Sequence, residues 1–397
     1  MATATTRIQE ARQATNPLFN DNRLKLGTFC TNVSNGSVAT TAEGSLELTW
    51  RNTLAIAQGS DRAGFEALVP LGRWRGYGGV TNFNGRSFEG LTWAAGLAQA
   101  TSYSALLSTS HVPHFHPTLV AKQSSTVDHI SGGRFGLNIV SGGDPAEFAM
   151  FGGTMRSHDE AYQYAEEWTQ VLLKLWTAEE PFDFDGRFFH LKGAISQPTP
   201  VQKPYPVIMC AASSAVGMRF TAKYADLSFI NFMSGDLDDW TAQVNEHKGL
   251  ARREFGRELG IWTKAFVVCR PTQREADEYY DYVCIEKADV EGDPTHFLLG
   301  KDERKDIREE KGYFYKQDAE RALRRNPGWP GHPLVGTAEQ VAGGLEKLAQ
   351  AGIDGCLLFW VDFEREQQQF VEEVLPLVEQ AGLREAFTPR TTAPGCA

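Results

Sequence analysis

The sequence predicts an α/β protein of the (β/α)8 TIM-barrel class. Eight short apolar runs alternate with longer stretches that have helical spacing of apolar residues. The runs are almost continuously apolar, as expected of parallel strands that are covered on both faces. Eight strand–helix units favour a closed barrel. A doubly wound sheet is disfavoured because Thr28–Gly36, after the first strand, lacks the glycine fingerprint of a dinucleotide site.

Each predicted strand is followed by a stretch that can form an amphipathic helix on the outside of the barrel. The predicted strands are, in chain order, Leu24–Cys30, Phe65–Val69, Tyr103–Ser110, Arg134–Val140, Pro206–Ala212, Leu227–Phe232, Ile261–Cys269 and Gly355–Val361. The predicted helical stretches are Glu47–Ala63, Phe88–Ala100, Pro117–Ile130, Asp159–Trp176, Ser214–Ala225, Leu237–Gly256, Gln273–Glu286, Thr337–Ala351 and, at the tail, Glu364–Ala381.

The chain is predicted to consist of a polar, aperiodic N-terminal arm, residues 1–22, and one barrel domain, residues 23–397. Two insertions interrupt the barrel. Residues 177–205 predict a small hairpin followed by a proline-rich connector. Residues 287–333 are charged, and so long an insertion in a compact barrel predicts a lid or binding loop. The alternative for this second insertion is a solvated helix without a role.

Composition excludes several classes of protein. A hydrophobic content of 42% and a charged content of 22% are ordinary for a globular protein. The net charge of −11 argues against nucleic acid or an anionic membrane as the main partner. The six cysteines form no C-x-x-C pair, so no zinc knuckle is predicted. No apolar run approaches about 18 residues and no secretory signal is evident, so we expect a cytoplasmic protein.

Active sites of such barrels form where the strands end, so the residues after each strand are the candidates for chemistry. The loop after the second strand, residues 70–79, contains Arg73, Arg75 and four glycines. Glycines let a backbone approach a planar ligand closely, and arginines can donate to an anion or an electron-rich ring. The alternative is a glycine-rich surface loop.

Three histidines after the third strand, His111, His114 and His116, have a spacing that invites a metal site. We predict no metal there, because no nearby carboxylate or cysteine completes a ligand shell. The alternatives are one histidine that lines the active site, or ordinary loop histidines.

Two further positions indicate a ligand. Asn138 lies inside an otherwise apolar strand, and a buried amide must be satisfied by the scaffold or by a ligand. Ser213 and Ser214 stand where the fifth strand turns into a helix, and the N–H groups of a helix start favour an anion such as phosphate. This second signal is weak alone, since every helix needs a cap.

The chain resembles the luciferase-like flavin-dependent monooxygenases from residue 24 to residue 382. The resemblance rests on Ser125–Gly143, His158–Tyr162, Trp168–Trp176 with Phe182–Phe189, Gln197–Pro200, Leu334–Ala342 and Gly352–Gly355. Within the family the chain is most similar to the pyrimidine monooxygenases, followed by the alkanesulfonate and dimethylsulfone monooxygenases. The features that carry this finer similarity are Arg75–Gly79, Gly132–Gly142 and Cys210–Met218.

The resemblance implies a (β/α)8 enzyme that uses reduced FMN and O2 on a small organic substrate, with cleavage of a C–N, C–S or C–halogen bond. It also implies a separate NAD(P)H-dependent flavin reductase, which meets the enzyme transiently, and a homo-oligomer, either a dimer or a tetramer. The alternatives are an oxidoreductase of the same superfamily that uses the deazaflavin F420, and a flavin-binding barrel without catalysis.

The resemblance also implies roles for individual residues. Thr109 and Asn138 match the pair that flanks the oxygen pocket beside the flavin, and His158 matches a histidine near the active site of the alkanesulfonate branch. The alternative for His158 is a helix-capping residue. Ala161 replaces an arginine of many relatives, which disfavours a sulfonate substrate. The implied flavin contacts are Gly72, Arg73, Thr109, Asn138, Glu147, Ala161, Tyr162, Ser213 and Ser214.

Overall fold

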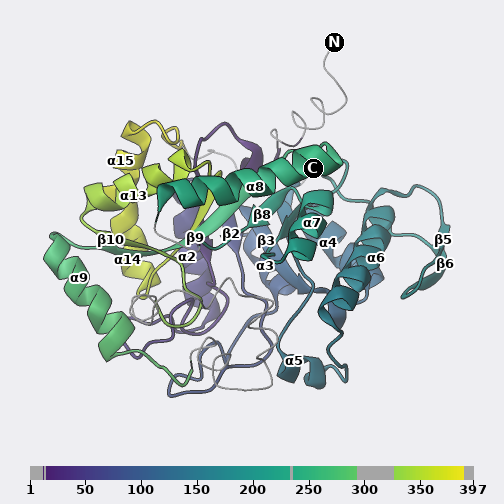
Figure 1. Ribbon diagram of the computed structural model, residues 1–397, viewed down its shortest axis with the longest axis horizontal. Coiled ribbons are helices and arrows are strands. Elements are labelled where there is room, and N and C mark those ends of the chain that lie inside the picture. The colour runs from purple at the N-terminus through teal and green to yellow at the C-terminus, as the bar shows by residue number, and fades with distance from the viewer. Residues whose placement is uncertain (1–11, 13–14, 233–235, 293–325, 389–397) are drawn as a thin grey trace, which may run out of the picture.

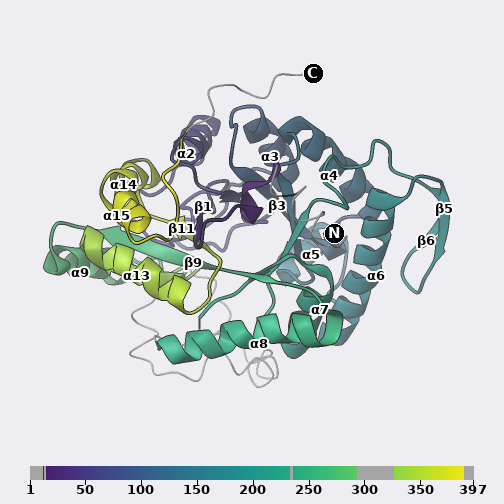
Figure 2. The ribbon, with the colours of Figure 1, turned by 90° about the horizontal axis from the view of Figure 1, so that it is seen from above.

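The computed structural model describes residues 12, 15–232, 236–292 and 326–388. Within them, eight parallel strands close into a barrel that helices surround (Figures 1 and 2). The barrel strands are β1 (Lys25–Phe29), β2 (Ala67–Val69), β3 (Ala105–His111), β4 (Phe135–Val140), β7 (Val207–Cys210), β8 (Leu227–Phe229), β9 (Gly260–Cys269) and β11 (Gly355–Phe359). Each lies in one of the apolar runs expected to form a strand, except that β3 and β9 each extend one residue beyond the run, and the predicted fold class is confirmed.

The strands follow one another around the barrel in chain order. β1 pairs with β2 on one side and with β11 on the other, and β9 pairs with β8 as well as with β11, which closes the ring. β3 and β4 therefore lie across the barrel from β9. Parallel strands all end at the same rim, so the residues that follow the eight barrel strands converge there.

Helices cover the outside of the barrel (Figure 2). They are α2 (Trp50–Arg62), α3 (Gly90–Ala98), α4 (Pro117–Ser131), α6 (His158–Thr177), α7 (Ala215–Tyr224), α8 (Leu237–Phe255), α9 (Gln273–Asp281), α13 (Ala338–Gln350), α14 (Phe363–Gln369) and α15 (Leu375–Gln380). Side chains of Thr49, Ser157, Ser214 and Thr272 cap four of them by accepting from backbone N–H groups. Each of these helices lies within a predicted helical stretch, give or take one residue at an end.

Two elements were not anticipated. The short helix α5 (Pro145–Met150) follows β4, and the strand β10 (His332–Gly336) lies outside the closed barrel. β9 has 10 residues. Its first three residues, Gly260–Trp262, pair with β8, and its last five, Ala265–Cys269, pair with β10. β10 is thus an extension of the sheet rather than a barrel strand.

The barrel interior is a packed core rather than a channel. Alternate residues of the strands point inward and form a buried cluster that includes Ala67, Ala105, Val207 and Leu357. Leu18, which precedes β1, belongs to the same cluster. At Gly27, on β1, a Cβ atom would lie 2.5 Å from the carbonyl oxygen of Ala67, so only glycine allows this approach of β1 to β2.

The described part of the N-terminal arm contacts the loops that precede β7 and β8. These loops lie at the amino ends of the strands, opposite the rim where the strands end. The Arg12 guanidinium pairs with the Asp226 carboxylate at 2.8 Å, and the Asn16 amide donates to Gln202 at 3.0 Å. The boundary between arm and barrel domain at residue 22 stays a prediction.

The two insertions differ in how much of them is described. In the first, β5 (Phe182–Asp185) and β6 (His190–Ala194) form an antiparallel hairpin that projects outward beside α6 (Figures 1 and 2). Most of the second, residues 293–325, lies outside the described residues, so its role as a lid stays a prediction. Both of its ends are described, and at the C-terminal end the Trp329 indole N–H donates to Asn84, in the loop after β2, at 2.8 Å.

None of the helices that the structure describes combines the length and the apolar character needed to cross a lipid bilayer.

Candidate functional site

A cavity of about 370 Å³ opens where the barrel strands end, a size typical of small-molecule sites. It is lined by residues of the strands and by the loops after β2 and β4. The lining residues are Phe29, Pro70, Leu71, Gly72, Arg73, Tyr77, Thr109, His111, Asn138, Val140, Gly142, Gly143, Asp144, Pro145, Ala211, Phe229, Asn231, Lys264 and Trp329.

Thr109 and Asn138, both expected at the reacting centre, meet on the wall of this cavity. They are direct neighbours in the β3–β4 pairing, and the Asn138 amide donates to the Thr109 hydroxyl at 3.2 Å. Thr109 in turn donates to the Pro70 carbonyl at 2.8 Å. The Asn138 side-chain carbonyl oxygen is buried and has no hydrogen-bond partner among the described residues. This oxygen can therefore accept a hydrogen bond from a ligand.

The loop after β2 brings its backbone to the cavity. A Cβ atom at Gly72 would lie 2.8 Å from His111 and 2.9 Å from Thr109, so a side chain there would collide with the cavity wall. Arg73 lies beside it, with its guanidinium 3.9 Å from the centre of the Tyr77 ring. Both expected flavin contacts of this loop thus line the cavity.

Glu147, the first-turn carboxylate of α5, holds this loop in place. One of its oxygens accepts from the backbone N–H groups of Trp74, at 2.8 Å, and Arg75, at 3.2 Å. The same oxygen pairs with the Arg73 guanidinium at 3.1 Å, and the Glu147 side chain is fully buried. Glu147 therefore organises the cavity wall without lining the cavity itself.

The histidines after β3 meet a carboxylate that is distant in sequence. One ring nitrogen of His111, one ring nitrogen of His114 and one carboxylate oxygen of Glu147 lie within 4.8 Å of one another. Each of these side chains has one buried atom without a hydrogen-bond partner among the described residues, namely His111 Nδ1, His114 Nε2 and Glu147 Oε2. Burial, as the main cause, lowers the pKa of His111 to about 3. Burial also lowers the pKa of His114. Both imidazoles are therefore neutral at neutral pH.

This cluster removes the argument used above against a metal, because the fold supplies the missing carboxylate. The charge of Arg73, however, still counts against a metal ion. The positive charge of Arg73 acts on His111 and lowers its pKa further, and the same charge disfavours a cation in the cluster. The expectation that no metal is bound stays a prediction.

Hydroxyl groups gather at the start of α7, where an anion was expected. Ser214 caps this helix, because its hydroxyl accepts from the Gly217 N–H at 3.2 Å. Tyr162, on α6, is close by, since a Cβ atom at Gly217 would lie 2.3 Å from its hydroxyl oxygen. Burial raises the pKa of the Tyr162 phenol, which is therefore a hydrogen-bond donor at neutral pH. Two donors and a helix N-terminus suit a phosphate group.

The other expected residues of this region lie apart from the cavity. His158 is the first residue of α6, with a side chain 40% exposed and 3.6 Å from the Asp159 carboxylate. None of the four residues His158, Ala161, Tyr162 and Ser214 lines the cavity. Their assigned roles stay predictions.

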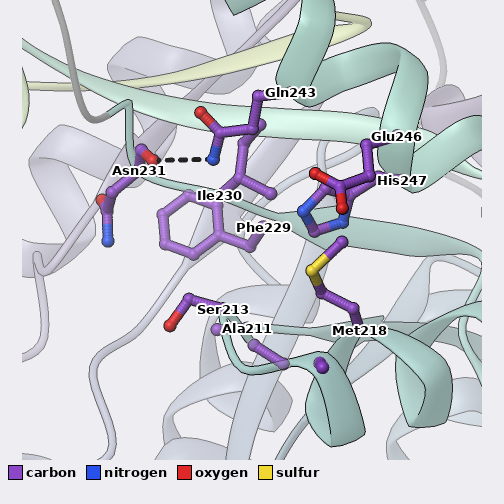
Figure 3. Close-up of a pocket in the computed structure, with 11 residues that line it drawn as sticks. Ala211, Ser213, Met218, Phe229, Ile230, Asn231, Gln243, Glu246 and His247 are labelled. Carbon is purple, nitrogen blue, oxygen red and sulfur yellow. Dashed lines mark hydrogen bonds between the residues drawn. The ribbon is translucent and has the colours of Figure 1, made fainter. Parts of the chain in front are cut away.

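Ser213 faces a second cavity of about 260 Å³, between α7 and α8 (Figure 3). Met218 of α7 and His247 of α8 face it from the two helices. Burial lowers the pKa of His247 to about 4. The two cavities share Ala211, Phe229 and Asn231 as lining residues.

Residues on the β1, β8 and β9 side of the mouth were not anticipated, above all Lys264. Its signal is visible in the sequence, because a single lysine interrupts the apolar run Ile261–Cys269. Trp329 also lines the mouth, and it belongs to the second insertion, which was expected to form a lid or binding loop.

Two known enzymes resemble this chain over most of its length. A dimethylsulfone monooxygenase of Pseudomonas putida, described as FMNH2-dependent, is 30% identical over 358 residues, which are 90% of this chain and 96% of that protein. A pyrimidine monooxygenase of Enterobacter sp. strain 638, RutA, is 31% identical over 363 residues, 90% of this chain and 96% of that protein.

Solved structures show the same fold. A riboflavin lyase has a TM-score of 0.80 at 22% identity, with 92% of this chain and 94% of that chain covered. A long-chain alkane monooxygenase has a TM-score of 0.78 at 21% identity, with 93% and 94% covered. Residues 24–355 match the family described as luciferase-like monooxygenase. The chain therefore belongs to the luciferase-like monooxygenase family.

Proposed function

We propose that this protein is a two-component monooxygenase that uses reduced FMN and O2 to oxygenate a small organic substrate, with cleavage of a C–N, C–S or C–halogen bond. The observation that carries the proposal is the Thr109–Asn138 pair on the cavity wall, with an amide carbonyl oxygen that no described residue satisfies. The named activities of the dimethylsulfone and pyrimidine monooxygenases support the same reaction class.

The residues present fit a flavin mononucleotide. The free carbonyl oxygen of Asn138 suits a ring N–H, and Gly72 presents its backbone, without a side chain, on the cavity wall. Tyr162, Ser214 and the N-terminus of α7 suit the phosphate. When bound, reduced FMN supplies the electrons that activate O2.

The chain itself supplies position and hydrogen bonds. Asn138 and Thr109 fix donors and acceptors at one face of the cavity, because each is held by a partner on a neighbouring strand or loop. Hydrogen-bonding groups that are fixed before reaction stabilise developing charge without reorganising. Glu147 keeps the loop of Gly72 and Arg73 in position. The insertion 287–333 is expected to exclude water from the mouth.

Two partners belong to this proposal. A separate NAD(P)H-dependent reductase would deliver the reduced flavin in a transient encounter, as the FMNH2 dependence of one relative suggests. We also expect a homo-oligomer, a dimer or a tetramer.

The test is product formation by wild type and Asn138→Ala with reduced FMN from a supplied reductase and O2. The substrates are a panel of pyrimidines, sulfones, sulfonates and halogenated compounds, and mass spectrometry detects the gain of oxygen. We expect wild type to convert at least one class and Asn138→Ala to lose at least tenfold in turnover. Asn138→Asp, which keeps the acceptor oxygen, is the matched control and should lose less.

The outcomes separate the alternatives. Equal turnover by wild type and Asn138→Ala would show that the role given to Asn138 is wrong. Tighter binding of F420 than of FMN would favour the deazaflavin alternative. Flavin binding without O2 consumption above that of free reduced flavin would indicate a barrel without catalysis.

A further inference from the structure

Lys264 is a buried lysine at the mouth of the barrel that the proposed reaction does not yet use. It lies on β9, its side chain is 5% exposed, and it lines the main cavity. Three aromatic rings surround its ammonium group, with centres at 5.3 Å for Phe29, 5.9 Å for Phe229 and 6.0 Å for Trp329. The charge is therefore held between ring faces, at the edge of the cavity.

No described residue neutralises this charge. Among the described parts of the chain, no carboxylate forms an ion pair with Lys264 and no acceptor takes a hydrogen bond from it. Among the described residues, the polar group that acts on this charge is the Cys30 thiol. Burial raises the pKa of this thiol far above its ordinary value, so the thiol is neutral. Burial of an ammonium without a partner is costly, and ring faces offset only part of that cost. A ligand anion would supply the missing partner.

The other cation on the cavity wall is already paired. Arg73 contacts the Glu147 carboxylate at 3.1 Å and Asp144 at 3.5 Å. Of the two cationic side chains that line the cavity within the described residues, Lys264 alone has no carboxylate partner.

The order of the strands separates two halves of the mouth. The residues that suit the flavin lie on β3, β4 and the loops after β2 and β7, whereas Phe29, Phe229 and Lys264 lie on β1, β8 and β9 across the barrel. Asn231, just after β8, adds an amide to this second half. Flat aromatic walls beside a single ammonium group suit a planar ring that carries a negative charge.

We propose that the β1–β8–β9 half of the mouth is the substrate subsite, and that it takes a flat aromatic or heteroaromatic compound with an anionic oxygen substituent that pairs with Lys264. The inference rests on the proposed function, because it assumes that flavin fills the opposite half. It adds to that function the chemical class of the substrate and the residue that selects it.

The experiment compares benzoate with benzamide, two flat probes of nearly the same shape that differ in charge. Binding to the FMN-loaded protein is measured by ligand-observed NMR or calorimetry. We expect wild type to bind benzoate at least tenfold more tightly than benzamide. Lys264→Met should abolish that preference while affinity for benzamide stays within threefold. Lys264→Arg, which keeps the charge, should retain part of the preference.

Lys192→Met is the matched control, because it removes a lysine from the exposed hairpin and should leave the preference unchanged. The proposal is overturned if wild type binds both probes equally, or if Lys264→Met still prefers benzoate. Circular dichroism confirms that each variant is folded. Lys264→Gln, which also removes the charge, takes the place of Lys264→Met should that variant fail to fold, with the same expected loss of the preference.

Failure of the subsite and failure of the proposed function are distinguishable. FMN binding is followed separately by quenching of flavin fluorescence, and the probe titrations are repeated without FMN. A preference for benzoate that depends on Lys264 in a protein that binds no FMN would contradict the function and keep the subsite. FMN binding without any preference would contradict the subsite alone.

Discussion

Asn138 donates from its amide to the hydroxyl of Thr109 at 3.2 Å, across the pairing of β4 with β3. The pairing register fixes this relationship, because a shift by one residue would turn the Asn138 side chain away from the barrel interior. The two side chains therefore meet at the mouth as a consequence of the same contacts that build the barrel. β4 places the acceptor oxygen of Asn138, and Thr109 on β3 orients the amide that carries it.

The Thr109 hydroxyl is expected to matter for turnover more than for flavin affinity. Thr109→Val keeps the shape but leaves the Asn138 amide and the Pro70 carbonyl without a partner. We expect product formation to fall by about 100-fold, the lower end of the range seen when one fixed donor is removed from a reacting centre, with FMN affinity changed less than about threefold. Steady-state turnover and flavin fluorescence measure the two effects. Thr109→Ser should stay near wild type, and a Thr109→Val enzyme of normal turnover would contradict the assignment.

Glu147 is expected to stabilise both the fold and the flavin half of the mouth. Glu147→Ala leaves the buried Arg73 guanidinium without its main partner, and breaking such a pair costs about 3–5 kcal/mol. Urea unfolding should show this loss, and FMN affinity should fall because the loop of Gly72 is released. Asp144→Asn is the control, since Asp144 lies farther from Arg73, at 3.5 Å, and is more exposed. Equal stability of the Glu147 and Asp144 variants would contradict the role of Glu147.

Much of this architecture could be predicted from the sequence, because each barrel strand is covered on both faces and is therefore apolar throughout. Asn138 could be singled out for the same reason, as a polar residue inside such a run. β10 could not, because it pairs with an extension of β9 that only the folded sheet reveals. The sequence also gave no sign that Glu147 would reach His111 and His114, since the fold alone brings these segments together.

Removal of metal is expected to leave turnover unchanged. Although His111, His114 and Glu147 have the donor types of a divalent-metal site, Arg73 lies against Glu147 and its charge acts on His111. A cation there would meet that charge at short range. Dialysis against a chelator followed by the turnover assay tests this, with metal content measured before and after. Loss of activity that zinc restores in wild type but not in His114→Ala would contradict the prediction.

Acid is expected to destabilise the protein through its buried neutral histidines, of which His247 gives the clearest test. His247 is 3% exposed, and burial lowers its pKa from 6.5 to about 4. Between these values the unfolded chain binds a proton that the folded chain does not, so the free energy of unfolding falls as the pH falls below about 6.5. At pH 5 one such group accounts for about 2 kcal/mol.

The comparison is between wild type and His247→Gln, each unfolded in urea at pH 7 and pH 5. The loss of stability between the two pH values should be about 2 kcal/mol smaller in the variant, because one titrating group is gone while the others remain. His190→Gln, on the exposed hairpin, is the control for loss of a histidine elsewhere. An identical loss in wild type and His247→Gln would show that His247 is protonated as readily in the folded protein as in the unfolded chain.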